Sequence, residues 1–297
     1  LFEDNRLGQP TWEKAESELQ RQCMEQLLRR AGLAPDALSL VFGGDLQCQC
    51  TASHYAMRQL DVPFAGLYGA CSTMAEGLAL AACFAACGLA DRAAALTSSH
   101  FCTAERQYRT PLTYGGKRTP TAQWTATAAG AVLLTPTGRG PQVGAVCFGR
   151  VRDFDVTDIN NMGAAMAPAA AETLLRFFAR SGRRPEDYDA IYTGDLGFVG
   201  SRLLLEILQS EGLTLQNHQD CGLLLYDRAR QQVKAGGSGA GCSAAVLAAH
   251  ILPGLAKGQL HRVLLLSTGA LMSQTTFLQG ESIPGIAHLV ELLAPGT

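Results

Sequence analysis

The chain has 297 residues and a mass of 31.4 kDa, and 47% of its residues are hydrophobic and 17% charged. This composition is typical of a globular protein with a large core and excludes a disordered chain. Its 24 basic and 26 acidic residues give a net charge of -2 without a polybasic cluster, which argues against a nucleic-acid partner.

The first predicted element is a helix over residues 13–31, whose apolar side chains recur with helical spacing. Gly32 ends it, and a proline-containing turn leads into a short apolar strand before Leu46. The same pattern returns 150 residues later, because RRAGLAPDALSLVFGGDL, which ends at Leu46, matches ARSGRRPEDYDAIYTGDL, which ends at Leu196. Gly182 takes the place of Gly32 in the second copy.

A second match involves two cysteines. A predicted strand ends at a corner of small residues, and a long alanine-rich helix follows from Cys71. Cys242 opens a similar helix, and the two helices precede the apolar strands ADRAAALTSS and LHRVLLLSTG. Because both matches occur in the same order, they predict two homologous halves, residues 1–150 and 151–297.

The remaining predicted elements complete these halves. Residues 127–134 and 142–151 are predicted to form an antiparallel pair that closes the first half. A helix over residues 168–181 is predicted to begin at Pro168, and residues 280–288 form a turn before the last strand. The alternation of helices and apolar strands predicts an α/β fold, in which two halves sharing one hydrophobic layer make five layers.

The cysteine pattern argues against a metal site. None of the ten cysteines forms a CxxC pair, and no histidine follows at ligand spacing, which predicts reduced thiols and no zinc. The glycine-rich turn at residues 235–245 does not match the dinucleotide-binding pattern. No stretch reaches 18 uninterrupted apolar residues, so no transmembrane helix is predicted, and the polar first residues predict no signal peptide.

Cys71 stands where the sequence changes from a strand to a helix. A cysteine at a helix N-terminus lies at the positive end of the dipole, which favours its thiolate, and the N–H groups of Ser72 and its neighbours could hold an anion. The plainer interpretation is a small buried residue at a tight corner. A reactive thiol, an anion site and a structural residue therefore all stay open.

His100 is the candidate base among the six histidines, because it follows an apolar strand at the end where α/β folds place ligands. A purely structural role is the alternative. Residues 103–125 come next and form the most basic stretch, which contains Arg106 and Arg109 among aromatic residues. A long loop of this composition would suit a planar dicarboxylate, whereas a solvated surface loop is the plainer interpretation.

Six segments carry a resemblance to a known family: GACSTMAEGLALA, TSSHFCTAERQYR, NNMGAAMAPAAAET, YTGDLGFVGS, GGSGAGCSA and QGESIPGIAH. With the duplication and the corner at Cys71, they resemble the stage V sporulation protein AD family of the thiolase-like superfamily, which includes the β-ketoacyl synthases. The resemblance spans essentially the whole chain and implies a five-layer αβαβα fold. The family has a further N-terminal segment, so the first strand of the half 1–150 is expected to be missing here.

The resemblance also implies an altered active site. The condensing enzymes of the superfamily pair the cysteine that matches Cys71 with two histidines, or with one histidine and an asparagine. The first partner falls on Gly194-Asp195 and the second near Gly237-Ser238, and neither position offers an imidazole or an amide. Without the base and the oxyanion hole, the resemblance implies a protein that is not an enzyme.

What the resemblance implies instead is binding of dipicolinic acid (pyridine-2,6-dicarboxylate), possibly as its calcium chelate, and support of its uptake into the developing spore. The pocket is expected where the halves meet. The predicted ligand-binding residues are Cys71, Ser72, His100, Arg106, Arg109, Asp195, Gly237 and Ser238. No cofactor is expected, and calcium is expected only as part of the ligand.

The same resemblance implies partners and a location. We expect membrane proteins of the same sporulation operon as partners, a cytoplasmic or peripheral position at the inner forespore membrane, and a homodimer built on the strand near residues 94–99. Two alternatives remain: an acyltransferase that uses Cys71 as nucleophile with His100 as base, and an adaptor that only assembles membrane partners.

Overall fold

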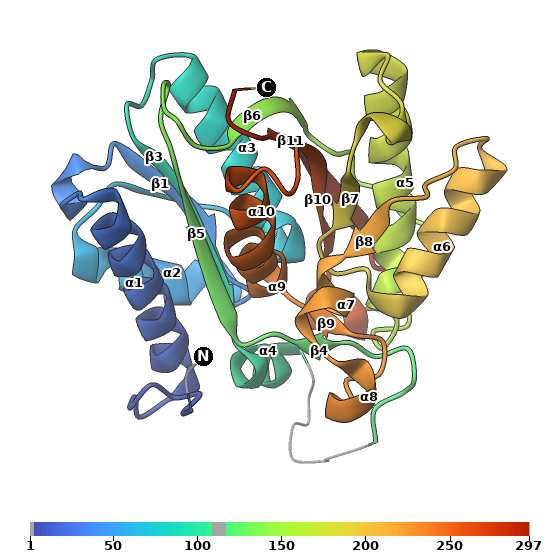
Figure 1. Cartoon of the computed structure of the whole chain (residues 1–297). Coiled ribbons are helices and arrows are strands. Elements are labelled where there is room, and N and C mark those ends of the chain that lie inside the picture. The colour runs from blue at the N-terminus through green and yellow to red at the C-terminus, as the bar shows by residue number, and fades with distance from the viewer. Residues whose placement is uncertain (1–2, 109–116, 297) are drawn as a thin grey trace.

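Two large β-sheets and three layers of helices make up the described part of the chain, residues 3–108 and 117–296, in this computed structural model (Figure 1). The outer layer of the first half holds α1 and α2, and that of the second half holds α5 and α6. Helices α3, α9 and α10 lie between the sheets. The predicted five-layer αβαβα architecture is therefore confirmed.

The elements of the first half are α1 (Trp12–Ala31), β1 (Leu40–Gly44), α2 (Thr51–Leu60), β2 (Phe64–Gly66), α3 (Thr73–Ala86), β3 (Ala93–Ser99), α4 (Phe101–Tyr108), β4 (Trp124–Thr125) and β5 (Ala128–Leu134). The large sheet of this half has the strand order β2-β1-β3-β5, with β5 antiparallel to β3.

The elements of the second half are β6 (Gln142–Cys147), α5 (Met162–Ser181), β7 (Ala190–Thr193), α6 (Gly197–Ser210), β8 (His218–Asp220), α7 (Cys221–Leu225), α8 (Arg228–Gln231), β9 (Gly237–Ser238), α9 (Ala240–Val246), α10 (Leu252–Ala256), β10 (Arg262–Ala270), α11 (Gln274–Leu278) and β11 (Gly285–Leu293). Its large sheet has the order β6-β11-β10-β7-β8, and β4 and β9 form a separate two-stranded sheet.

The two sequence matches correspond to equivalent elements. Gly32 and Gly182 both end a helix in the left-handed conformation, at φ angles of 66° and 67°, which only glycine adopts without strain. The strands that follow, β1 and β7, each pair in parallel with the strand after the cysteine-containing helix, β3 and β10. The glycine stops predicted from the sequence are therefore confirmed.

The predicted antiparallel pair of residues 127–134 and 142–151 is wrong. Both segments contain a strand, but β5 pairs with β3 and β6 pairs with β11, so the two strands belong to different sheets. The connection between them crosses from one half to the other. β5 pairs with the buried strand β3, and β6 pairs with the buried strand β11. Closeness in sequence therefore did not determine the pairing of β5 and β6.

Two further expectations change. The strand near residues 94–99, predicted as a dimer edge, is β3, and it lies between β1 and β5 inside the sheet. A sheet that continues into a second copy would have to use β2 or β5 instead. The helix predicted to start at Pro168 begins at Met162, and Pro168 lies inside it. One interior N–H is therefore missing, and the helix continues because tertiary packing buries its apolar face.

The outer edge of β5 is open among the described residues, whereas β6 covers the equivalent edge of β11. A groove of about 1000 Å³ runs beside β5 and is lined by residues 131–134 of the strand, by Leu27 of α1, by Leu78 of α3 and by Leu252 of α10. Most residues of β5 are partly exposed and apolar.

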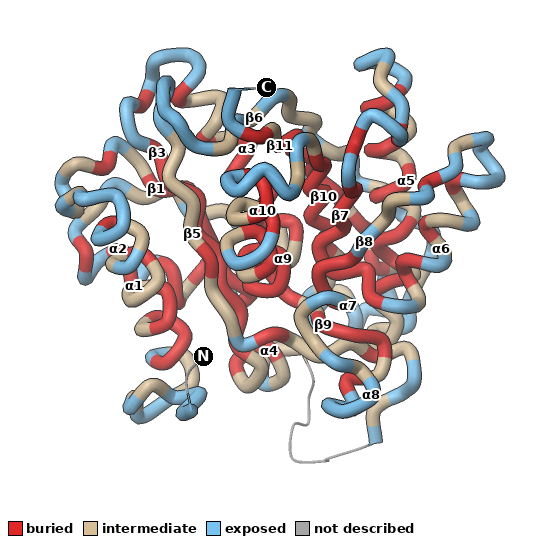
Figure 2. Tube along the Cα trace, viewed as in Figure 1, coloured by how far each residue is buried: buried red, intermediate tan, exposed pale blue. Residues whose placement is uncertain are grey.

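Small residues allow the layers to approach closely. Figure 2 shows that α9 and the strands β7 and β10 are largely buried, while the outer faces of α1, α2 and α6 are exposed. A Cβ atom on Gly130 of β5 would lie 2.3 Å from the carbonyl oxygen of Ala244 in α9. None of the helices in the described ranges is long and apolar enough to cross a membrane.

Candidate functional site

A sharp backbone turn presents Cys71 at the junction of the two halves. After β2, a single 3-10 turn (Ala70–Ser72) leads directly into α3. Ala70 has a φ angle of 53°, in the left-handed region that costs a non-glycine residue energy. The Thr73 hydroxyl stabilises the turn, because it donates to the Ala70 carbonyl at 2.7 Å and accepts from the Gly69 N–H at 3.2 Å.

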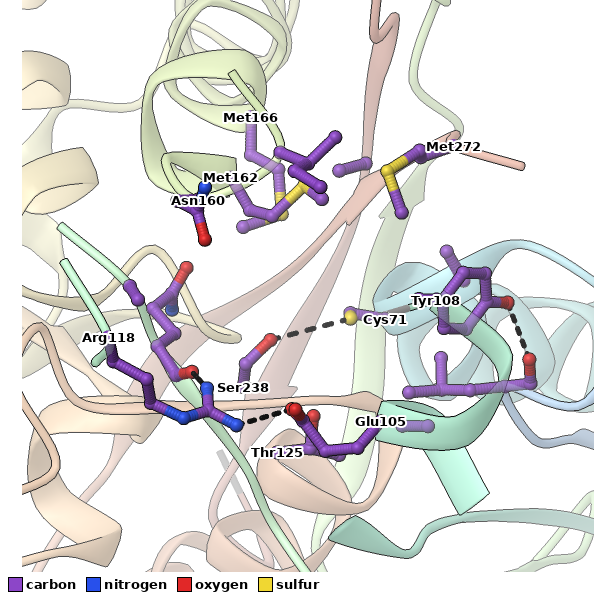
Figure 3. Close-up of a pocket in the computed structure, with 17 residues that line it drawn as sticks. Cys71, Glu105, Tyr108, Arg118, Thr125, Asn160, Met162, Met166, Ser238 and Met272 are labelled. Atoms are coloured by element: carbon purple, nitrogen blue, oxygen red, sulfur yellow. Dashed lines mark hydrogen bonds and ion pairs between the residues drawn. The ribbon is translucent and has the colours of Figure 1, made fainter. Parts of the chain in front are cut away.

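Cys71 lines a cavity of about 150 Å³ between the halves. Figure 3 shows three methionines, Met162, Met166 and Met272, on one side of the cavity, and Arg118 with Glu105 on the opposite side. The other lining residues are Leu46, Ala70, Ala104, Tyr108, Ala122, Gln123, Thr125, Ile159, Asn160, Ser238 and Ala270. The cavity thus combines a methionine-rich apolar side with a polar, charged one.

Arg118 is held firmly on the polar wall. Its guanidinium carbon lies 4.5 Å from the centre of the Trp124 ring and 5.2 Å from that of Phe101, and these two rings stack with centroids 4.5 Å apart. Its Nη1 donates to the Gln123 carbonyl at 2.9 Å, and its Nη2 forms an ion pair with Glu105 at 2.5 Å. Stacking and hydrogen bonding together fix a cation whose position matters for any anionic ligand.

Cys71 faces Ser238, with Sγ and Oγ 4.0 Å apart (Figure 3). The Ser238 hydroxyl in turn contacts Asp195. The Asp195 carboxylate accepts from the Ser238 hydroxyl at 3.1 Å, from the Gly239 N–H at 2.8 Å and from the Thr268 hydroxyl at 2.9 Å. Burial raises the pKa of Asp195. Burial, reinforced by the nearby Asp195, also raises the pKa of the Cys71 thiol well above its usual value.

The raised pKa of Cys71 limits the chemistry that its sulfur can perform. A raised pKa keeps the sulfur as the neutral thiol, which is a poor nucleophile. None of the described residues that line the cavity is a histidine, so no imidazole stands ready to take the thiol proton. Among the described residues no group of three or more histidine, cysteine, aspartate or glutamate side chains could hold a metal ion.

Four of the predicted residues come together here. Cys71 and Ser238 line the cavity, Asp195 lies behind them, and the Gly237 carbonyl accepts a hydrogen bond from Gln123 at 2.9 Å. Ser72 is adjacent but fully buried, and its N–H donates to the Gly69 carbonyl at 3.1 Å. The expectation that this N–H holds an anion is therefore wrong, because the 3-10 turn already uses it.

Two of the three predicted basic residues, His100 and Arg106, do not line this cavity. His100 is buried elsewhere, where its Nε2 contacts the Asn5 carbonyl at 2.9 Å and its Nδ1 accepts from the Cys102 N–H at 3.1 Å; burial lowers its pKa. Arg106 pairs with Glu13 and lies over the ring of Trp12. Arg109 lies outside the described residues.

Sequence reasoning missed the cation and the apolar wall. Arg118 belongs to the basic stretch, but only the fold shows that it, rather than Arg106, turns toward the cavity. Met162 and Met166 stand four residues apart, a spacing that would have placed both on one face of a helix had α5 been predicted to begin earlier. The expected helix start at Pro168 hid that signal.

Comparison with known proteins identifies close sequence relatives. The family model of stage V sporulation protein AD matches residues 1–293. Stage V sporulation protein AD of Bacillus subtilis (strain 168) is 43% identical over 288 residues, which cover 97% of this chain and 85% of that protein.

Solved structures with low sequence identity share the fold. The 3-oxoacyl-[acyl-carrier-protein] synthase III of Aquifex aeolicus VF5 is similar over 92% of this chain and 83% of its own, with a TM-score of 0.59 and 14% identity. The tetronic acid condensing enzyme AbyA1 matches over 94% and 86%, with a TM-score of 0.60 and 19% identity. A variant of OleA from Xanthomonas campestris matches over 93% and 80%, with a TM-score of 0.61 and 16% identity. These similarities confirm the thiolase-like fold.

Proposed function

The chain belongs to the stage V sporulation protein AD family, and from this premise we propose that its cavity binds dipicolinic acid. Family membership assigns the chain a role in sporulation. In the proposal, the protein binds the acid without altering it and supports its uptake into the developing spore. The observation that carries the proposal is a fixed guanidinium across from three methionine side chains in one small cavity.

The size and the lining of the cavity support a planar aromatic acid. A cavity of ~150 Å³ in another protein holds a benzene ring, and this cavity has about the same volume. The methionine side chains offer polarizable sulfur to the face of a ring. Arg118 offers a planar donor group that matches a carboxylate, and its stacking on Trp124 keeps it oriented.

The arrangement around Cys71 supports binding without catalysis. Its thiol is held neutral, and the described lining contains no imidazole that could act as its base. The Asp195 carboxylate accepts hydrogen bonds from Ser238, Gly239 and Thr268 in its buried position, and its nearby negative charge opposes formation of the Cys71 thiolate. The acyltransferase alternative would need an imidazole beside Cys71, and the described lining residues include none.

The proposal includes a place for the protein in the cell. We retain membrane proteins of the same operon as its partners, and with them a peripheral position at the inner forespore membrane. A homodimer also remains part of the proposal, although its interface must lie elsewhere than β3.

Calorimetric titration with dipicolinate, with and without calcium, tests the proposal directly. We expect saturable binding to the wild-type chain and weaker binding to pyridine-3,5-dicarboxylate, whose carboxylates diverge. Arg118→Gln should weaken binding by about 10- to 100-fold, the cost of losing a charge-assisted hydrogen bond. Arg106→Ala is the matched control, since Arg106 pairs with Glu13 outside the cavity, and it should bind as the wild type does.

Two results would overturn the proposal. Absence of saturable dipicolinate binding under both calcium conditions would leave the adaptor alternative. Covalent labelling of Cys71 by an acyl-CoA, seen as a mass increase on the peptide that contains it, would favour the acyltransferase.

A further inference from the structure

The carboxylate of Glu105 forms an ion pair with Arg118, whose guanidinium is the group that the proposed ligand would bind. Glu105 Oε1 lies 2.5 Å from Arg118 Nη2, and the two side chains are only 11% and 13% exposed. Figure 3 shows the two groups meeting at the polar wall of the cavity. An ion pair that is largely withdrawn from water is stronger than an exposed one, so this contact competes seriously with any other anion.

Arg118 cannot easily serve two carboxylates from its fixed position. Its Nη1 is engaged with the Gln123 carbonyl, and its ring contacts restrain the plane of the guanidinium. A planar guanidinium recognises a carboxylate along one edge of its fork. A ligand carboxylate that approaches the Nη2 side therefore meets Glu105 in its place.

The charge balance of the cavity leads to the same conclusion. Among the described lining residues, Arg118 and Glu105 are the two that belong to the charged types Asp, Glu, Lys and Arg. The charges of these two residues balance each other, so a dianion that binds Arg118 while Glu105 stays in place brings a like charge against the Glu105 carboxylate. Moving Glu105 away from the guanidinium relieves that repulsion and leaves Arg118 to the ligand.

We infer that Glu105 is a built-in competitor, which holds the carboxylate subsite of Arg118 in the empty cavity and is displaced when a carboxylate ligand binds. This inference rests on the proposed function, because it assumes that a dicarboxylate enters this cavity. It assigns Glu105 the role of setting the affinity and of selecting for anionic ligands. A neutral ligand of the same shape gains nothing from displacing it.

Glu105→Gln tests the inference, because the amide keeps the shape of the side chain and removes its charge. We expect dipicolinate to bind about tenfold more tightly to this variant than to the wild type. The affinity for the neutral analogue pyridine-2,6-dicarboxamide should not change. Glu13→Gln is the matched control: it removes the partner of Arg106, an ion pair outside the cavity, and should leave both affinities unchanged.

Scanning calorimetry provides a second readout. Glu105→Gln leaves the Arg118 charge without its partner, so the empty variant should unfold at a lower temperature than the wild type, and dipicolinate should raise its unfolding temperature by more. If the variant is too unstable to titrate, Glu105→Asp takes its place. Its shorter side chain should hold Arg118 less closely, so its affinity for dipicolinate should also rise, but by less.

The outcomes separate the two proposals. Equal or weaker dipicolinate binding by both Glu105 variants, with the wild type still binding through Arg118, would overturn the competitor role and leave the proposed function standing. An equal gain for the dicarboxamide would also overturn it, since charge would then not be the cause. Absence of binding by the wild type and by every variant would overturn the proposed function itself.

Discussion

Replacing Glu16 with glutamine should change how the stability of the protein depends on pH. Glu16 lies on α1 and is completely buried. It accepts hydrogen bonds from the Ser98 hydroxyl at 2.8 Å, from the Thr103 hydroxyl at 2.7 Å and from the Gln47 amide at 2.9 Å. These contacts tie the outer helix to the sheet and to α4, so the ionisation of one carboxyl affects several elements.

The magnitude follows from the pKa of this carboxyl. Burial, and then the nearby Asp45, raise the pKa of Glu16 from 4.5 to about 7. Since each pH unit is worth about 1.4 kcal/mol, ionising Glu16 costs the folded state about 3 kcal/mol. Below pH 4.5 the group is protonated in both states and its full contribution is present. As the pH rises, the unfolded chain ionises first, so stability is lost progressively until the pH exceeds about 7.

Urea unfolding of the wild type and of Glu16→Gln between pH 5 and pH 8 measures the effect. Glutamine does not ionise, so the free energy of unfolding of the variant should gain about 2.5 kcal/mol on that of the wild type between pH 5 and pH 8. Glu13→Gln, at a half-buried position of the same helix, should show no such trend. A difference between wild type and Glu16→Gln that is the same at pH 5 and pH 8 would refute the reasoning.

Two further predictions concern other parts of the molecule. Cys71 should react with iodoacetamide at pH 7 far more slowly than the exposed Cys48, because its pKa is raised; faster labelling of Cys71 in a peptide map would contradict this. Gly130→Ala should lower the free energy of unfolding by about 1–3 kcal/mol, since the new Cβ overlaps the Ala244 carbonyl. Gly140→Ala, with no atom within 4 Å of the added carbon, should stay within about 0.5 kcal/mol of the wild type in the same chemical denaturation, and equal losses would refute the steric argument.

The duplication and the layered fold could be predicted from the sequence because their signals are local. A left-handed helix end requires glycine, so Gly32 and Gly182 marked equivalent points in both halves. The turn at Cys71 was also predicted from its small residues. Strand pairing was not predictable, since a short apolar strand such as β5 or β6 carries no information about which buried strand it will join.

Which charged residues line the cavity depends on the direction in which each side chain leaves helix α4. Residues 103–125 were predicted to be a loop, but their first part continues α4. Successive residues of a helix point about 100° apart, which separates Glu105, in the cavity, from Arg106, beside Trp12. Composition could indicate that this stretch holds cations and aromatic rings, whereas their sorting between cavity and surface required the helix to be placed.

The open edge of β5 is a place where a further strand can pair with the sheet. The outer edge of β11 is paired with β6. Among the described residues no strand pairs with the outer edge of β5, so its N–H and C=O groups lie unpaired beside apolar side chains. The residues of β5 include no lysine or proline, the residues that commonly prevent pairing at a sheet edge. An extended chain in the groove would hydrogen-bond with the backbone of β5 and pack against the apolar side chains that line the groove. We therefore expect self-association in concentrated solution to begin at the seven residues of this strand, Ala128–Leu134.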